Sequence, residues 1–271
     1  MLPSPESVAA IVAEVAAEEL MPRFRHLEAG DVRDKGPGDP VTVADEAAER
    51  ALTRRLAALL PGSLVVGEEA ASADPDVVKR LSGDAPVWII DPVDGTTNFA
   101  AGLPIFAVII GLVQGGEMRL ACLHDPVHGE TALASAGDGA TLNGRRIAVA
   151  TPDAPKNMYG TVKLRFGERA LPRRIVERCQ NVPAFMDLRC AAHEYIALAS
   201  GRLHYALYRK LMPWDHAAGN LLQREAGGYG AHLDGTPYRA DGPDHSHGFL
   251  YAPDEAAWRA LVEALIGAEP L

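Results

Sequence analysis

Two aspartates with a fixed spacing follow a short hydrophobic run in the first half of the chain. The run at 87–90 leads directly into Asp91, and Asp94 comes three residues later. Because Pro92 holds a turn between them, the carbonyl of Val93 can face the same way as both carboxylates. Carboxylate and carbonyl oxygens are the ligands that hard cations such as Mg²⁺ prefer. The spacing therefore predicts a cation site at the end of a buried strand.

The residues that follow are suited to an anion. Gly95 lets the backbone approach a ligand closely, and Thr96 and Thr97 can open a short helix whose free amides favour negative charge. Cation ligands beside phosphate-binding amides are what metal-assisted phosphoryl chemistry requires. An Asx turn with a helix cap is the structural alternative for the same residues.

Three further segments place acids at the ends of predicted elements. Glu68 follows the apolar stretch 63–67, and Asp215 stands at a helix start. Asp45 lies three residues after Thr42, which is the spacing of a helix capping box. Taken singly, a solvated glutamate or a helix cap explains each of them.

Alternating helices and strands must position these acids. Apolar residues at Val8, Ile11, Val12 and Val15 predict a helix ending near Pro22. The stretch 31–40, rich in glycine, proline and charge, predicts a mobile loop. Other predicted helices lie near 52–59, 168–179, 191–200 and 255–266 and after Asp215, and other strands near 105–113, 119–123, 130–135, 146–150, 203–208 and 248–252. The interspersed pattern favours a layered α/β sandwich with much antiparallel sheet.

Composition narrows the classes of protein. The 271 residues carry a formal net charge of −10, which argues against a general nucleic-acid-binding surface. Apolar runs of the roughly 20 residues that a membrane span requires are absent, and the acidic first helix does not look like a secretory signal. The three cysteines are widely and irregularly spaced, so we expect them reduced and the protein cytoplasmic.

Together and in this order, the acidic segments resemble the inositol monophosphatase family of magnesium-dependent, lithium-sensitive phosphatases, over about residues 5 to 265. The segments Asp91–Thr96 and Trp214–Asp215 carry the resemblance most specifically. It implies a layered α-β-α-β-α sandwich of the sugar-phosphatase type, in one compact unit. Residues 1–150 would form an α+β layer with the metal-binding motifs, and residues 151–271 an α/β layer that completes the active site. A homodimer is expected as well.

The resemblance also implies a role for each matching residue. Glu68, Asp91 and the Val93 carbonyl would hold a first Mg²⁺. Asp91, Asp94 and Asp215 would hold a second, and Glu68 would help to bind a weaker third. Four clustered carboxylates would repel one another without cations, so the charges agree with this assignment.

The same resemblance assigns the phosphate and the water. The amides of Gly95 and Thr96 would bind the phosphate. Thr96 and Asp45 would orient the attacking water, and Glu68 would join them as a catalytic residue. Lys35, in the predicted loop, would lie near the third metal.

The chain departs from the family where the alcohol part of the substrate should lie. Tyr208 stands where members that act on inositol usually carry a glutamate, and Arg209 follows it. Arg189 lies in a stretch where the family tends to have Gly-Ser. We expect Tyr208, Arg209 and Arg189 to contact the substrate. Strand alternation points Tyr208 and Arg209 to opposite faces, so both can do so only if the strand has ended.

The implied function is Mg²⁺-dependent hydrolysis of a small phosphate monoester by direct attack of water, with inhibition by Li⁺. Inositol monophosphate is the family default. Histidinol phosphate, a sugar phosphate or a nucleotide 3′-phosphate would use the same chemistry. A regulatory binding protein is an alternative of another class, because some bacterial relatives bind RNA-processing or transcription machinery. For this acidic chain we expect neither a nucleic-acid nor a membrane partner.

Overall fold

A computed structural model describes residues 2–36, 38–163, 165–166, 169–170, 173–242 and 248–267. Its helices are α1 (Pro5–Val15), η1 (Ala16–Leu20), α2 (Val43–Leu59), α3 (Glu68–Ala73), η2 (Pro75–Ser82), α4 (Thr96–Ala100), η3 (Pro155–Asn157), α5 (Arg173–Arg178), η4 (Cys179–Asn181), α6 (Ala191–Ala199), α7 (Pro213–Glu225) and α8 (Glu255–Leu265). Its strands are β1 (Val32–Gly36), β2 (Asp39–Thr42), β3 (Leu64–Gly67), β4 (Val87–Asp94), β5 (Ala107–Gln114), β6 (Glu117–Asp125), β7 (Glu130–Ser135), β8 (Gly139–Leu142), β9 (Arg145–Arg146), β10 (Tyr159–Val162), β11 (Arg165–Phe166), β12 (Arg169–Ala170), β13 (Ala184–Met186), β14 (Tyr205–Tyr208), β15 (Tyr229–His232) and β16 (Phe249–Ala252).

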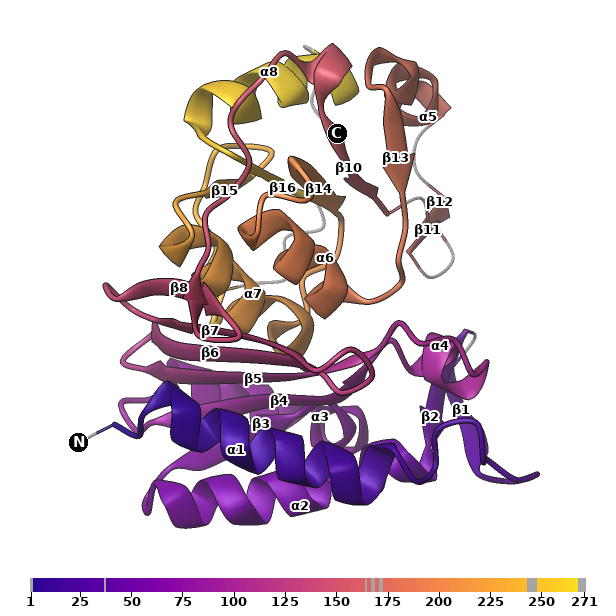
Figure 1. The fold of residues 1–271 in the computed structure, drawn as a ribbon, viewed down its shortest axis with the longest axis vertical. Helices are drawn as coiled ribbons and strands as arrows, with labels where there is room; N and C mark the ends of the chain where they lie inside the picture. The colour runs from indigo at the N-terminus through magenta and orange to yellow at the C-terminus, as the bar shows by residue number, and fades with distance from the viewer. Residues whose placement is uncertain are drawn as a thin grey trace.

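These elements stack in alternating layers along the long axis (Figure 1). Helices α1 and α2 cover one face of a seven-stranded sheet of order β3-β4-β5-β6-β7-β8-β9. Helices α6 and α7 lie between that sheet and a five-stranded sheet of order β13-β10-β14-β16-β15, and α5 and α8 lie beyond the second sheet. The predicted layered α-β-α-β-α fold is confirmed. The predicted boundary near residue 150 falls between the last strand of the first sheet and the first strand of the second.

Parallel pairing occurs at two places, and both matter for the site. Strands β3 and β4 are parallel, with Gly67 opposite Ile90, so the residues after them meet at one edge of the seven-stranded sheet. In the other sheet, β10 is parallel to both β13 and β14. Ligands of α/β sheets commonly bind outside the carboxyl ends of parallel strands.

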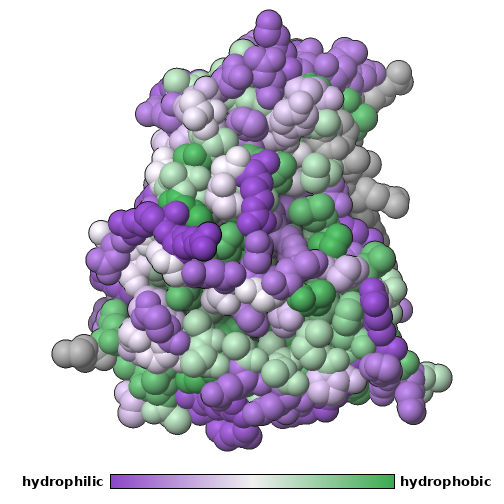
Figure 2. Space-filling model, in the orientation of Figure 1, coloured by the Kyte–Doolittle hydropathy of each residue, from purple (hydrophilic) through white to green (hydrophobic). Residues whose placement is uncertain are grey.

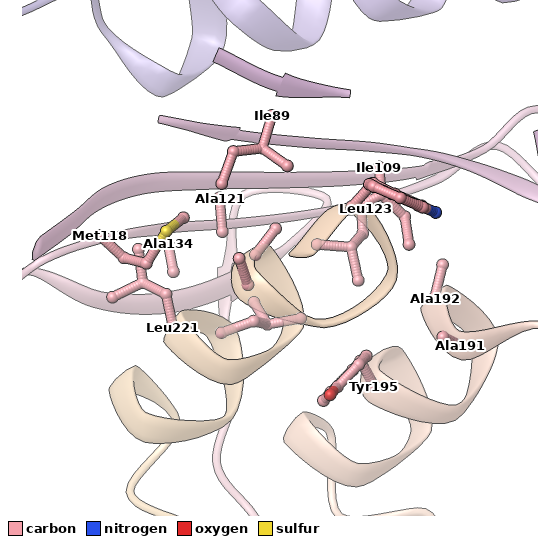
Figure 3. Close-up of a cluster of buried hydrophobic side chains, with 14 of the residues drawn as sticks. Ile89, Ile109, Met118, Ala121, Leu123, Ala134, Ala191, Ala192, Tyr195 and Leu221 are labelled. Carbon is pink, nitrogen blue, oxygen red and sulfur yellow. The ribbon is translucent and has the colours of Figure 1, made fainter. Parts of the chain in front are cut away.

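The seven-stranded sheet is buried on both faces, which explains the continuous apolar run that precedes Asp91. On one face, Ile109 and Leu123 of the sheet lie opposite Leu221 of α7 and Tyr195 of α6 (Figure 3). On the other face, the buried side chains of α1 and α2 form a second cluster with the sheet. Packing on both sides fixes the strand that carries Asp91.

Several local features differ from expectation. Within the described part of the helix expected near 168–179, Arg169–Ala170 form strand β12, and the helix α5 begins at Arg173. The stretch 31–40, predicted as a mobile loop, contains most of the antiparallel hairpin β1–β2. The strand expected near 146–150 ends at Arg146. Strand β4 runs past Asp91 to Asp94, with a shift of register against β5 between these two residues. Pro92 has no N–H to donate to the ladder, so an irregular pairing is expected there.

The surface does not indicate a particular class of partner. On the face shown in Figure 2, hydrophilic residues dominate the top and bottom of the molecule, and apolar residues are scattered between them. Within the described residues, none of the helices combines the length and the apolar character that crossing a bilayer requires.

Candidate active site

The structure brings the predicted metal ligands to one cavity of about 740 Å³. We call Glu68, Asp91, Asp94 and Asp215 the acidic wall of this cavity. Glu68 directly follows β3, Asp91 and Asp94 belong to β4, and Asp215 lies in the first turn of α7. Val93, whose carbonyl is a predicted metal ligand, lines the cavity as well. Residues far apart in the sequence thus meet because two parallel strands end, and α7 begins, at the same place.

The acidic wall carries unbalanced negative charge. Burial raises the pKa of Asp91 well above its usual value, and the neighbouring carboxylates of Glu68 and Asp94 raise it further. Burial and the charge of Glu68 likewise raise the pKa of Asp215. Each ionised carboxylate disfavours ionisation of the others, so a cation would stabilise all of them.

The chemistry of these donors fits Mg²⁺, although their arrangement is not that of a finished metal site. Across the described ranges, no three carboxylate, imidazole or thiol groups form a recognisable metal site. One oxygen of Asp94 instead accepts hydrogen bonds from the Ala192 amide at 2.5 Å and the Cys190 thiol at 3.1 Å. The donors that line the cavity are nevertheless carboxylate and carbonyl oxygens, which are the ligands of Mg²⁺.

Lys35 reaches the acidic wall from β1. Its Nζ lies 2.6 Å from Oε1 of Glu68 and 3.0 Å from Oε1 of Glu69. Burial lowers the pKa of Lys35, but the charges of the two glutamates outweigh burial and raise it overall. The ammonium group therefore stays protonated and balances part of the negative charge.

Thr96 and Asp45 meet as the sequence predicts. The Thr96 hydroxyl lies 3.0 Å from Oδ1 of Asp45 and 2.9 Å from the Val93 carbonyl. Asp45 also accepts the amide of Thr42 at 2.9 Å, which completes the capping box of α2. Burial raises the pKa of Asp45 to about 6, although hydrogen bonds from Thr42 and Thr96 oppose the shift. Asp45 is fully buried and is not among the cavity-lining residues, so it acts through Thr96 and is a positioning residue.

Gly95 is required at its position for two reasons. Its φ is +94°, in the left-handed region that favours glycine. A Cβ there would lie 2.8 Å from the Ile105 carbonyl oxygen and 3.4 Å from that of Arg189. Gly95 and Thr96 both line the cavity, where their amides were expected to bind phosphate.

The same cavity also carries positive charge. We call Lys163, Arg189 and Lys210, with Asp187 between them, the basic wall. Lys163 follows β10, Asp187 follows β13, and Lys210 comes just after β14, so this wall is built from the carboxyl ends of three parallel strands. The sequence analysis did not identify Lys163, Asp187 or Lys210.

Two of the three predicted substrate contacts, Tyr208 and Arg189, line the cavity. The third, Arg209, does not line it, but its neighbour Lys210 does. β14 ends at Tyr208, so Arg209 and Lys210 lie beyond the strand, where alternation does not fix the direction of a side chain. The expected condition for Arg209 to contact the substrate is met, yet it is Lys210 that lines the cavity.

Cys190 is a further residue that sequence reasoning did not connect with the site. It is buried and free, as are the other two cysteines, in agreement with their expected reduced state. Its thiol is one of the donors to Asp94, so its contact is with a predicted metal ligand. In the sequence Cys190 is an isolated cysteine, and nothing connects it with the aspartate 96 residues earlier.

Comparison with known proteins identifies the family of the chain. The model of the inositol monophosphatase family matches residues 4–266. An inositol-1-monophosphatase of Mesorhizobium japonicum is 32% identical over 255 residues, which are 92% of this chain and 91% of that protein. The Nus factor SuhB of Escherichia coli is 32% identical over 233 residues, or 82% of each chain. The chain belongs to the inositol monophosphatase family.

Solved structures show the same architecture. The Thermotoga maritima IMPase superposes with a TM-score of 0.79 at 27% identity, covering 96% of each chain. The extragenic suppressor protein suhB of Bartonella henselae superposes with a TM-score of 0.83, covering 97% of this chain and 99% of that one. At 24% identity, this second likeness concerns the fold alone.

Proposed function

We propose that the protein is a Mg²⁺-dependent phosphomonoester hydrolase of the inositol-1-monophosphatase type. One observation carries the proposal: four buried or half-buried carboxylates line one cavity beside the hydrogen-bonded pair Thr96 and Asp45. Structural ion pairs do not require such an excess of acid, but binding of divalent cations does.

Glu68, Asp91 and the Val93 carbonyl would hold one Mg²⁺, and Asp91, Asp94 and Asp215 a second. Bound Mg²⁺ would lower the pKa of a coordinated water and neutralise charge on the phosphate and the leaving oxygen. The amides of Gly95 and Thr96 would orient the phosphate.

Thr96 would orient the attacking water. Its hydroxyl has a single proton, and donating it to Asp45 leaves lone pairs that accept a hydrogen bond from a water in the cavity. Asp45 would keep the hydroxyl in that orientation while it is ionised. The other acceptor in reach, the Val93 carbonyl, would become occupied as a metal ligand. Orientation of a nucleophile is a substantial part of catalysis in phosphoryl transfer.

Inositol monophosphate is the first substrate to test, because relatives of 31 to 34% identity are named inositol-1-monophosphatases. Histidinol phosphate, sugar phosphates and nucleotide 3′-phosphates remain alternatives with the same chemistry. Tyr208 favours testing them, since a phenol accepts hydrogen bonds from a polyol less strongly than a carboxylate does.

A second candidate function follows from the relatives named Nus factor SuhB, which are equally similar to this chain. A regulatory role of that kind would need a macromolecular partner. The absence of a nucleic-acid partner therefore stays a prediction, as do the homodimer and the cytoplasmic location.

The experiment measures phosphate released from a broad panel of phosphomonoesters, with Mg²⁺ and with a chelator. We expect release from inositol 1-phosphate or another member of the panel in Mg²⁺ only. Failure of every substrate in millimolar Mg²⁺, with a folded protein, would favour the binding role instead.

A further inference from the structure

The two walls of the cavity differ in charge, and the basic wall has cations to spare. Lys163 is paired with two carboxylates, those of Asp187 and Glu194, at 2.8 Å each. The guanidinium of Arg189 donates to the hydroxyl of Thr97 at 3.3 Å, and in the described part of the chain neither the Arg189 nor the Lys210 side chain forms an ion pair. Lys210 is near enough to Asp215 for its charge to lower the pKa of that carboxyl, but within the described residues no carboxylate lies within ion-pair distance of either cation. Both cations are thus open to an anionic ligand.

The side chain of Lys163 is largely buried in this wall. Its side chain is 13% exposed, and its partner Glu194 is completely buried. Glu194 also accepts the Leu188 amide at 3.2 Å, so the carboxylate is held in place. An ammonium group has three protons to donate, and these two ion pairs use two of them. Because Lys163 lines the cavity, the third is available to a ligand.

Tyr208 connects these cations to the buried Glu194. Its side chain is 1% exposed and lines the cavity, and Nζ of Lys163 lies 5.9 Å from the centre of its ring. Burial, the charge of Glu194 and a hydrogen bond to Glu194 that falls outside normal geometry raise the pKa of the phenol. Tyr208 therefore belongs to the same cluster as Lys163 and Glu194 and helps to fix the position of Lys163 at the cavity.

The backbone of Arg189 is a third sign. Its φ is +52°, in the left-handed region that a bulky residue adopts at a cost and glycine adopts freely. A strained residue whose side chain lines a cavity is more common at binding sites than elsewhere. An arginine also offers a planar fork of donors that matches a carboxylate or phosphate.

We propose that the basic wall binds a second anionic oxygen group on the alcohol part of the substrate. This inference rests on the proposed function, since it assumes that the acidic wall and its cations bind the phosphate that is cleaved. Lys163 and Arg189 contact the second anion, Lys210 adds charge, and Tyr208 lines the cavity beside them. The substrate class is a phosphomonoester that also carries a carboxylate or a further phosphate.

The test uses three small compounds that differ only at the distal group. Glycerol 3-phosphate is neutral there, 3-phosphoglycerate carries a carboxylate, and glycerol 1,3-bisphosphate carries a second phosphate. Affinity in Mg²⁺ is measured by calorimetry, and kcat/KM by phosphate release. We expect at least one anionic compound to exceed glycerol 3-phosphate about tenfold in both quantities. The better of the two identifies the anion.

Two variants locate the effect. Arg189→Gly removes the guanidinium and also relieves the strain of a positive φ angle, so we expect the variant to fold. Lys210→Gln removes an exposed charge. Each should lower the preference for the anionic compound by about threefold or more, within the range measured for exposed charge pairs. Arg259→Gln, which removes another exposed cation on α8 outside the cavity lining, should leave the preference unchanged.

The outcomes separate the two proposals. Equal affinity of the wild type for all three compounds overturns the basic-wall proposal, and so does a preference that survives in both variants. Absence of phosphate release from any compound, with a calorimetric preference that Arg189→Gly reduces, overturns the proposed hydrolysis and leaves the anion site standing.

Discussion

The acidic and basic walls are built alike but are encoded differently. Each is formed where parallel strands end, β3 and β4 for the acidic wall and β13, β10 and β14 for the basic wall. Two of the acidic residues share the short segment Asp91–Asp94, whereas the basic residues are single positions between residues 163 and 210. Metal chemistry limits the ligands to a few residue types at fixed spacing. A substrate-binding wall has no such limit, so it can change while the chemistry is kept.

Replacing Asp91 should have the largest effect, because this residue would touch both cations. We expect Asp91→Asn to lower kcat by more than about a thousandfold, a rise of about 4 kcal/mol in the barrier. Without Mg²⁺ the variant should be at least as stable as the wild type, because one of several mutually repelling carboxylates is removed.

Measurement of kcat and of the thermal midpoint checks both parts of this prediction. Asp84→Asn, at an exposed aspartate outside the cavity, is the matched control. Retention of more than about a tenth of kcat in Asp91→Asn would rule out the bridging role.

Thr96 should matter for the rate and little for the metal. Thr96→Ala with Asp45→Asn should lower kcat about a hundredfold, the low end for a positioned proton-transfer group. The affinity for Mg²⁺ should change far less, because neither side chain is a proposed ligand. Thr151→Ala, at an exposed threonine, serves as the control. Weakened Mg²⁺ binding with unchanged kcat would mean that the pair supports the ligands instead.

Lithium should inhibit turnover. The family's second metal site is represented here by Asp91, Asp94 and Asp215, which all line the cavity. If Li⁺ occupies this site after turnover and retains phosphate, inhibition will be uncompetitive with respect to substrate. Initial rates at several Li⁺ and substrate concentrations test this, and full activity in high millimolar Li⁺ would count against it.

Stability without metal should depend on pH in an unusual direction. The pKa of Asp45 is raised to about 6 in the folded protein, and those of Asp91 and Asp215 are also raised, so these three carboxyl groups bind more protons in the folded than in the unfolded state above about pH 4. Burial lowers the pKa of His216 to about 3, which opposes this trend below about pH 6.5, but with one group against three. Unfolding free energy then falls as pH rises through the folded-state pKa values. The thermal midpoint in a chelator should be a few degrees higher at pH 5.5 than at pH 7.5, and Mg²⁺ should reduce the difference. A midpoint that rises with pH in the chelator would contradict the assigned shifts.

The sequence predicts the acidic wall well because each of its residues ends a recognisable apolar run or begins a helix. It predicts the basic wall poorly for identifiable reasons. Lys163 follows β10, a four-residue strand that hydrophobic periodicity did not reveal. Lys210 lies beyond the end of β14, where strand alternation no longer predicts the direction of a side chain. The family resemblance paired Asp45 with Thr96, but the complete burial of Asp45 was not predictable, because a capping box explains the same residues at the surface of a helix.

Calorimetric titration of Mg²⁺ tests the central claim most directly, namely that the acidic wall is a cation site. The experiment compares the wild type, Asp215→Asn and the control Asp84→Asn, each in the presence of inorganic phosphate. We expect saturable binding by the wild type and the control, and binding weakened at least about tenfold in Asp215→Asn. Equal Mg²⁺ affinity in all three proteins, or no binding by the folded wild type, would contradict the account.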